Sequence, residues 1–111
     1  MNKDMIKQPN HYMSNGEETI VKIVKIRGIL CAIEFCEGNI IKYQDRAEFK
    51  GNKEQDLEKA KEYERMSEDL KKIRTHIYKV QEDQPWMCTY RETARLVQLW
   101  SENGHSLEGI L

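Results

Sequence analysis

The feature that most constrains the fold is residues 53–83, an uninterrupted run that contains neither glycine nor proline. The run is rich in Glu, Lys, Leu and Ala, which have high helix propensity. Apolar residues within it are spaced alternately by four and three positions, which is a heptad pattern: Met66, Leu70, Ile73, Ile77 and Val80. Because the pattern covers only about two heptads, it favours a face of a helix bundle over a free coiled coil, although a dimer seam stays open.

Three further helices are predicted around this long one. Two stretches have the Ser/Thr-x-x-Glu spacing of a capping box, which predicts helix starts at Ser14 and Thr89. The first of these helices should end near Gly28, a second should occupy residues 30–49, and the last should end before Gly104. The sequence therefore predicts an all-α fold, a small helical domain with a long central helix.

The size and composition of the chain indicate how such a domain completes its core. Only 39% of the 111 residues are hydrophobic, and a short chain with a thin core is often stabilised by other subunits. We therefore expect a homo-oligomer. Because the composition changes after Pro85, we divide the chain into a helical domain, residues 1–83, and a tail, residues 84–111, that serves packing or assembly.

Several classes of protein are disfavoured. The N-terminus has no apolar signal segment and no stretch approaches the ~20 apolar residues of a membrane span, so a cytoplasmic protein without membrane association is expected. The 18 Lys+Arg and 19 Asp+Glu residues argue against a broadly basic nucleic-acid coat protein. The three cysteines form no Cys-x-x-Cys pair, so we expect small buried side chains and no metal site.

A chemically interesting group of residues lies in the predicted helix 30–49 and just beyond it. At 100° per residue, Asn39, Tyr43, Arg46 and Lys50 fall within about 40° of a common direction, and Lys42 lies about 60° from it. One face thus offers an amide, a phenol and several cations, which suits a phosphate or another anion. The sequence has no P-loop, and an ordinary solvated helix face remains the alternative.

In addition to this helix face, the sequence contains several short motifs in an order that resembles a known protein family. The motifs are Pro9-Asn10-His11-Tyr12, then Gly38-Asn39-Ile40-Ile41-Lys42-Tyr43 with Arg46, then Lys50-Gly51, and last Asp56-Leu57, Lys59-Ala60 and Tyr63. Together they resemble a family of small bacteriophage proteins, much of it uncharacterised, over about residues 7–66. One characterised member is a nucleotide kinase without a P-loop that assembles into a large oligomer.

The resemblance implies nucleotide binding in the cytoplasm of an infected bacterium, with ATP or another nucleotide as substrate or ligand. The residues implied to bind the nucleotide are His11, Tyr12, Asn39, Lys42, Tyr43, Arg46 and Lys50. In a kinase, Arg46, Lys42 and Asp56 would be catalytic, with the cations neutralising the transferred phosphoryl group. Asp56 has a plainer role as a negative charge near the start of the long helix.

Three alternatives stay open. The first is sequestration of a nucleotide, for example a host immune signal, without phosphoryl transfer, so the sequence does not decide whether the protein is an enzyme. The second, ranked lower, is a nucleoside triphosphate pyrophosphatase with magnesium held by Glu17, Glu18, Glu34 and Glu37. The third is DNA binding or regulation by the tail, which resembles the opening of a helix-turn-helix unit. The tail lacks a recognition helix and has only Arg91 and Arg95 as cations, so nucleic acid is not the expected partner.

Overall fold

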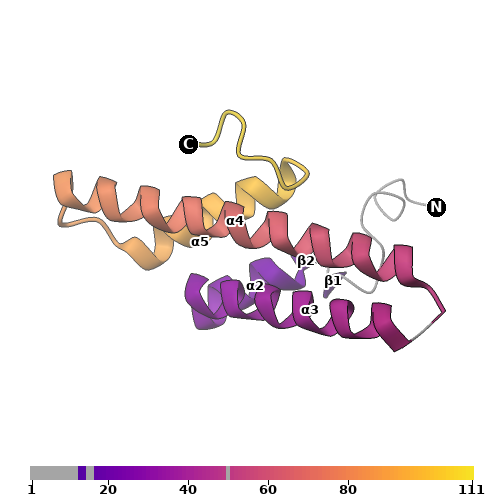
Figure 1. Ribbon diagram of the computed structural model, residues 1–111. Helices are drawn as coiled ribbons and strands as arrows, with labels where there is room; N and C mark the ends of the chain where they lie inside the picture. The colour runs from indigo at the N-terminus through magenta and orange to yellow at the C-terminus, as the bar shows by residue number, and fades with distance from the viewer. Residues whose placement is uncertain (1–12, 15–16, 50) are drawn as a thin grey trace.

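The computed structural model describes residues 13–14, 17–49 and 51–111, and these form a helical fold (Figure 1). Its helices are α2 (Thr19–Arg27), α3 (Ile29–Phe49), α4 (Lys53–Asp83) and α5 (Thr89–Glu102). The strands β1 (Met13–Ser14) and β2 (Glu17–Glu18) form a short antiparallel pair that precedes α2. The all-α prediction is confirmed, and so is the long central helix.

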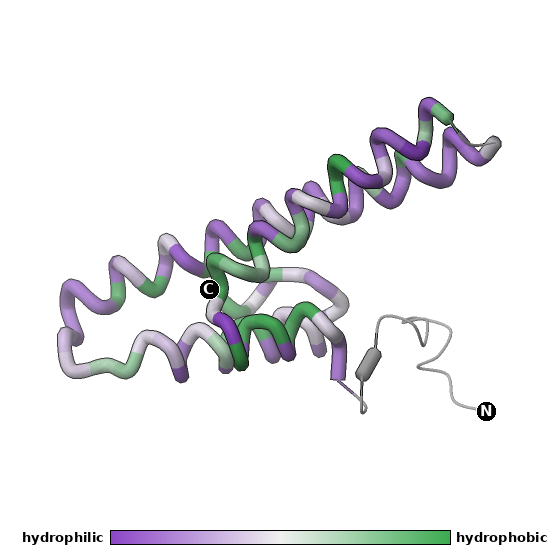
Figure 2. Tube along the Cα trace, turned by 90° about the horizontal axis from the view of Figure 1, so that it is seen from below, coloured by the Kyte–Doolittle hydropathy of each residue, from purple (hydrophilic) through white to green (hydrophobic). Residues whose placement is uncertain are grey.

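Helix α4 organises the fold because the other long helices pack along its length. Helix α3 lies beside the first part of α4, and α5 returns beside the second part (Figure 1). Helix α2 contacts both α3 and α5 and so closes the bundle. Most of α4 is hydrophilic and carries hydrophobic residues at intervals (Figure 2), as expected for a helix with one buried face. No helix in the described part of the chain is long and apolar enough to cross a membrane.

All four described helices contribute to one hydrophobic core. Its most buried members are Ile20, Val21 and Val24 in α2, Ala32, Ile33 and Cys36 in α3, Leu70, Ile73 and Ile77 in α4, and Leu96, Val97 and Trp100 in α5. Three of these are heptad positions of α4, so the stripe is a bundle face within this chain, as predicted. The division of the chain at residues 83 and 84 stays a prediction.

The predicted helix ends are more accurate than the predicted helix starts. Gly28 closes α2 with a φ of 92°, and Gly104 follows α5 with a φ of 69°. The helix start at Ser14 is wrong, because Ser14 pairs in β1 and α2 begins at Thr19. Helix α5 begins at Thr89 without a side-chain cap, because Glu92 binds Arg95 instead of the helix start.

The three cysteines differ in their environments. Cys36 is buried as expected, but Cys31 and Cys88 are exposed, so the expectation of three buried cysteines is wrong. Burial raises the pKa of the Cys36 thiol to about 12, and the nearby charges of Glu37 and Glu18 act in the same direction. The Cys36 side chain therefore stays a protonated apolar group in the core.

Candidate functional site

The predicted site residues that the structure describes meet where the second half of α3 runs beside the start of α4. Arg46 of α3 lies opposite Asp56 of α4, with 4.0 Å between Arg46 Nε and Asp56 Oδ1. Tyr43 of α3 stacks on Tyr63 of α4. Two motifs that are separate in the sequence therefore form one surface, which we call the α3–α4 site.

Aromatic rings form the base of this site. The rings of Tyr43 and Tyr63 are 6.0 Å apart at an angle of 14°, and Phe35 meets Tyr63 edge-on at 6.1 Å. Lys42 Nζ lies 4.7 Å from the centre of the Tyr43 ring, and Arg46 Cζ lies 5.7 Å from it. These distances suit cation–π attraction, so one ring draws two cations to the same part of the surface.

The carboxylate of Asp56 is the unusual group of the site. Asp56 is only 5% exposed, and its Oδ2 is buried without a hydrogen-bond partner. The distance of 4.0 Å from Oδ1 to Arg46 is that of an ion pair and too long for a hydrogen bond. Its position in the first turn of α4 supplies favourable helix-dipole attraction, but a buried oxygen without a donor is costly. Such an exception in a folded protein calls for an explanation, and a functional role is one of them.

The cations of the site face solvent. The Arg46 side chain is 52% exposed and Lys42 is also exposed, so both can contact a ligand. The half-buried Asn39 donates its amide N–H to the carbonyl of Phe35 at 2.8 Å, so this donor is used within α3. A Cβ at Gly38 would meet nothing within 4 Å, so packing of the described residues does not explain this glycine. His11, Tyr12 and Lys50 lie outside the described residues.

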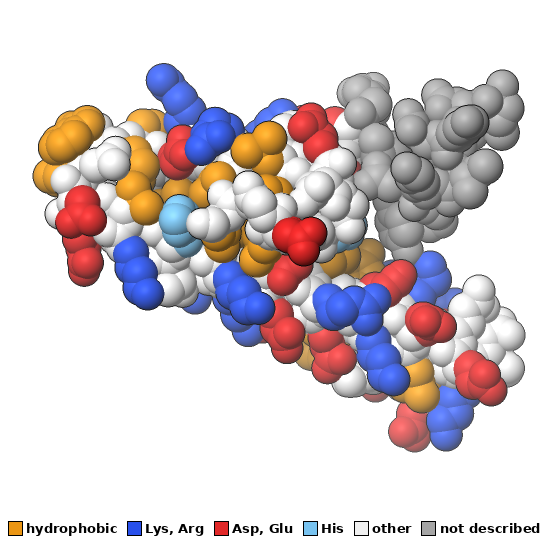
Figure 3. Space-filling view, turned by 90° about the horizontal axis from the view of Figure 1, so that it is seen from above, with side chains coloured by type: hydrophobic (Ala, Val, Ile, Leu, Met, Phe, Trp, Pro, Cys, Tyr) orange, Lys and Arg blue, Asp and Glu red, His pale blue; other side chains and the backbone are white. Residues whose placement is uncertain are grey.

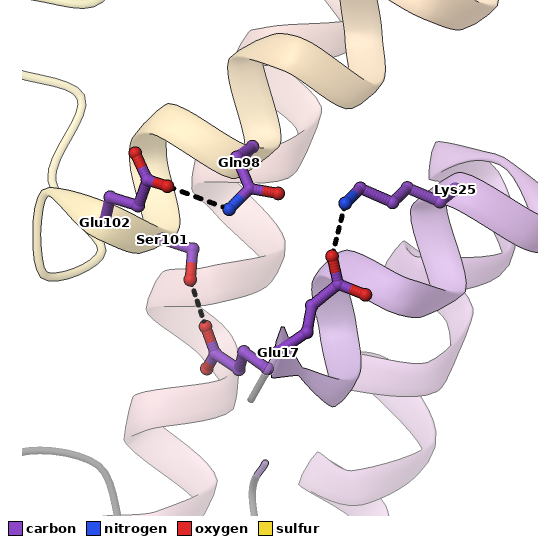
Figure 4. A network of polar contacts seen from close by, with 6 residues as sticks. Glu17, Lys25, Gln98, Ser101 and Glu102 are labelled. Carbon is purple, nitrogen blue, oxygen red and sulfur yellow. Dashed lines mark hydrogen bonds and ion pairs between the residues drawn. The ribbon is translucent and has the colours of Figure 1, made fainter. Parts of the chain in front are cut away.

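The four glutamates of the magnesium alternative do not converge. Glu17 pairs with Lys25 (Figure 4), and Glu37 pairs with Lys71 at 2.9 Å. Glu18 binds residues near the C-terminus instead. Within the described ranges, no group of three His, Cys, Asp or Glu residues could hold a metal ion. The pyrophosphatase alternative therefore loses its proposed metal ligands.

A second polar cluster, which sequence reasoning missed, connects β2 to the C-terminal segment. Glu18 accepts hydrogen bonds from Ser101 Oγ at 2.7 Å (Figure 4) and contacts His105 Nε2 at 2.8 Å. His105 stacks on Trp100 at 4.3 Å, and the Trp100 indole donates to Asp69 at 2.9 Å. The hydroxyl of Ser101 binds the carboxylate rather than the imidazole, so this is not a nucleophilic Ser-His arrangement. No local pattern could reveal it, because Glu18 is far from the others in sequence.

Comparison with known families finds a family match for the part of the chain that carries the α3–α4 site. The DUF3310 family, described as a protein of unknown function, matches residues 6–65, slightly more than half of the chain. The chain belongs to the DUF3310 family. No curated protein and no solved structure matches it. The DUF3310 match includes Arg46 and Asp56 and ends within α4, so the second part of α4 and all of α5 lie beyond it.

Proposed function

We propose that this DUF3310 protein binds the phosphate of a nucleotide at the α3–α4 site. The observation that carries the proposal is the buried Asp56 carboxylate, which has an unpartnered oxygen and lies next to the half-exposed Arg46. The guanidinium of Arg46 can grip two phosphate oxygens, and Lys42 adds a point charge on the same side. A rotation of the Asp56 side chain would expose its buried Oδ2, which then accepts a hydrogen bond from a sugar hydroxyl or a base amine of the same ligand.

The proposal assigns further roles on the basis of the resemblance to small phage proteins. Tyr43 and Asn39 position the sugar or base, and His11, Tyr12 and Lys50 supply additional ligand contacts. On the basis of the same resemblance, we propose that the protein acts in the cytoplasm of an infected bacterium.

Phosphoryl transfer and simple binding make different demands on the α3–α4 site. A nucleotide kinase would use Lys42 and Arg46 to neutralise the transferred group and Asp56 as a base, with ATP as donor. Sequestration of a nucleotide requires only affinity, which the two cations and the free carboxylate oxygen already favour. We therefore propose nucleotide binding as the primary function and phosphoryl transfer as an additional activity of the same site.

Assembly into a homo-oligomer is part of the proposal. Two large hydrophobic side chains of α3 remain exposed, with Phe49 81% exposed and Ile41 62% exposed. Contiguous exposed apolar surface commonly marks a contact between proteins. A second copy of the chain that covers this surface would bring further groups close to the ligand.

One experiment separates these functions. The full chain is incubated with labelled ATP and a panel of deoxynucleoside monophosphates, and calorimetry is run with the same nucleotides. Phosphate transfer identifies a kinase, whereas tight binding without transfer identifies a sequestering protein.

The variant Arg46→Ala tests the position of the site, and we expect it to abolish both signals. Arg65→Ala is the matched control, because Arg65 is also exposed but lies on α4 away from Asp56. A folded Arg46→Ala protein with full binding or activity would show that the ligand binds elsewhere.

A further inference from the structure

Charged residues are distributed unevenly along α4. Acidic and basic residues are mixed over residues 53–69, and Figure 3 shows red and blue side chains alternating toward the α3–α4 end at the lower right. Residues 70–81, in contrast, contain no Asp or Glu. They contain the cations Lys71, Lys72, Arg74 and Lys79, and also His76. A chain with a net charge of −1 therefore carries a concentrated positive segment.

The helix brings most of these groups to one side. Lys71, Lys72, Thr75, His76 and Lys79 line a shallow depression of about 330 Å³, and we call this surface the basic face of α4. With a rise of 1.5 Å per residue, the face extends for about 12 Å along the helix axis. An elongated ligand with several negative charges fits this arrangement better than a single ion does.

Two carboxylates near the basic face, Glu37 and Glu92, are paired with cations, and Glu68 and Glu82 lie one turn before and one turn after the face. Glu37 of α3 binds Lys71 at 2.9 Å. Hydrogen bonding to Arg95 lowers the pKa of Glu92 in α5, and the charges of Arg95 and His76 also lower it. Glu92 is thus paired with Arg95, and Lys72 and Lys79 remain exposed.

An exposed aromatic side chain borders the same surface. Tyr78 is 60% exposed and lies three residues after Thr75, one turn along the helix, and seven after Lys71, two turns along the same side. Interleaved cations and exposed aromatic rings are typical of surfaces that bind single-stranded nucleic acid, because rings stack on unpaired bases. A membrane surface is less suitable, because the apolar stripe of α4 is buried in the core.

We propose that the basic face of α4, together with Tyr78, binds single-stranded nucleic acid. Lys72 and Lys79 contact backbone phosphates, Thr75 donates a hydrogen bond, and Tyr78 stacks on a base. This surface lies beyond the DUF3310 match and does not include the α3–α4 site, so it adds a binding function independent of nucleotide binding.

The test is fluorescence anisotropy with the full chain and a labelled oligothymidylate of about 20 nucleotides, titrated at several salt concentrations. We expect saturable binding that weakens as salt increases. The double variant Lys72→Gln/Lys79→Gln should weaken binding about tenfold and reduce the log–log salt slope by about 0.7 for each lost phosphate contact. Tyr78→Ala should weaken binding about tenfold by removing a stacking ring, whereas Tyr78→Phe should retain it.

The matched control is Lys53→Gln/Lys61→Gln, which removes the same charge from exposed positions of α4 outside the basic face. Lys61 is 11 residues from Lys72, about 16 Å along the helix, which exceeds the ~10 Å screening length at 0.1 M salt. We expect the control to change affinity less than about twofold. Arg46→Ala should bind the oligonucleotide normally, which separates this test from that of nucleotide binding.

Three results would overturn the proposal. They are the absence of saturable binding at low salt, an equal loss of affinity in the control variant, and tighter binding of a duplex of the same sequence than of the single strand. Circular dichroism of each variant establishes that it is folded before its affinity is compared.

Discussion

Two buried carboxylates in this protein have opposite surroundings. Glu18 is 7% exposed and binds both Ser101 at 2.7 Å and His105 at 2.8 Å. Asp56 is 5% exposed, but its one described partner, Arg46, is 4.0 Å away, and its other oxygen has none. Two carboxylates that are almost equally buried therefore differ in whether their oxygens find hydrogen-bond partners.

The difference follows from what each carboxylate connects. Glu18 joins β2 to the end of α5 and the segment after it, so its hydrogen bonds hold together parts of the chain that are distant in sequence. Asp56 lies at the start of α4 and contacts the exposed side of α3 through Arg46. A satisfied buried carboxylate stabilises the fold, whereas an unsatisfied one carries a desolvation cost.

The largest effect on stability is expected from Glu18→Ala. The change leaves Ser101 and His105 without their shared acceptor, and we expect the free energy of unfolding to fall by about 2 to 4 kcal/mol. Urea unfolding followed by circular dichroism measures this loss. Glu18→Gln is the matched control, because its amide oxygen can still accept one hydrogen bond and should preserve part of the stability. Equal losses in both variants would mean that the charge matters more than the hydrogen bonds.

Asp56→Asn should affect stability much less than Glu18→Ala does. The substitution removes a buried charge that has one long ion pair and one unpartnered oxygen, so the free energy of unfolding should change by less than about 1 kcal/mol. Nucleotide binding, measured by calorimetry, should nevertheless be lost. A loss of stability as large as that of Glu18→Ala would show that both carboxylates are structural and would remove the distinction between them.

The smallest effect is expected at Glu92, a carboxylate that water largely solvates. Its hydrogen bond with Arg95 lowers its pKa below the ordinary value of 4.5, so the unfolded state binds more protons as the solution becomes acidic. The stabilisation is therefore present above pH 4.5 and is lost as the pH falls through the lower native pKa. Unfolding curves of the wild type and Glu92→Gln should differ slightly at neutral pH and converge in acid. A difference that grows as the pH falls would contradict this assignment.

Local sequence patterns were sufficient to predict the helices. The run without Gly or Pro predicted α4 over residues 53–83, and the heptad stripe predicted its buried side, because helix propensity and periodicity act within a few turns. The capping box at Ser14 failed as a predictor, because Glu17 pairs with Lys25 and α2 begins only at Thr19. The box at Thr89 predicted the correct start of α5, although Glu92 binds Arg95 instead of capping the helix. Exposure of Cys31 and Cys88 was equally unpredictable, since it depends on which faces the helices bury.

The candidate site was partly predictable. The spacing of Tyr43 and Arg46 placed both on one face of α3, and the structure brings them next to each other and to Lys42. The stacking of Tyr43 on Tyr63 and the burial of Asp56 depend on how α4 turns back along α3. Helical spacing says nothing about that crossing, so these contacts required the tertiary structure.

The sequence by itself determined an all-α chain, the length of its central helix and the side of that helix that is buried. It also determined the charge content, including the absence of acidic residues over 70–81. Only the tertiary structure decided which carboxylates find partners: it placed Glu18 beside Ser101 and His105 and left Asp56 with a free oxygen. The physical reason is that helix formation depends on neighbouring residues, whereas satisfying a buried charge depends on groups that packing brings from distant parts of the chain.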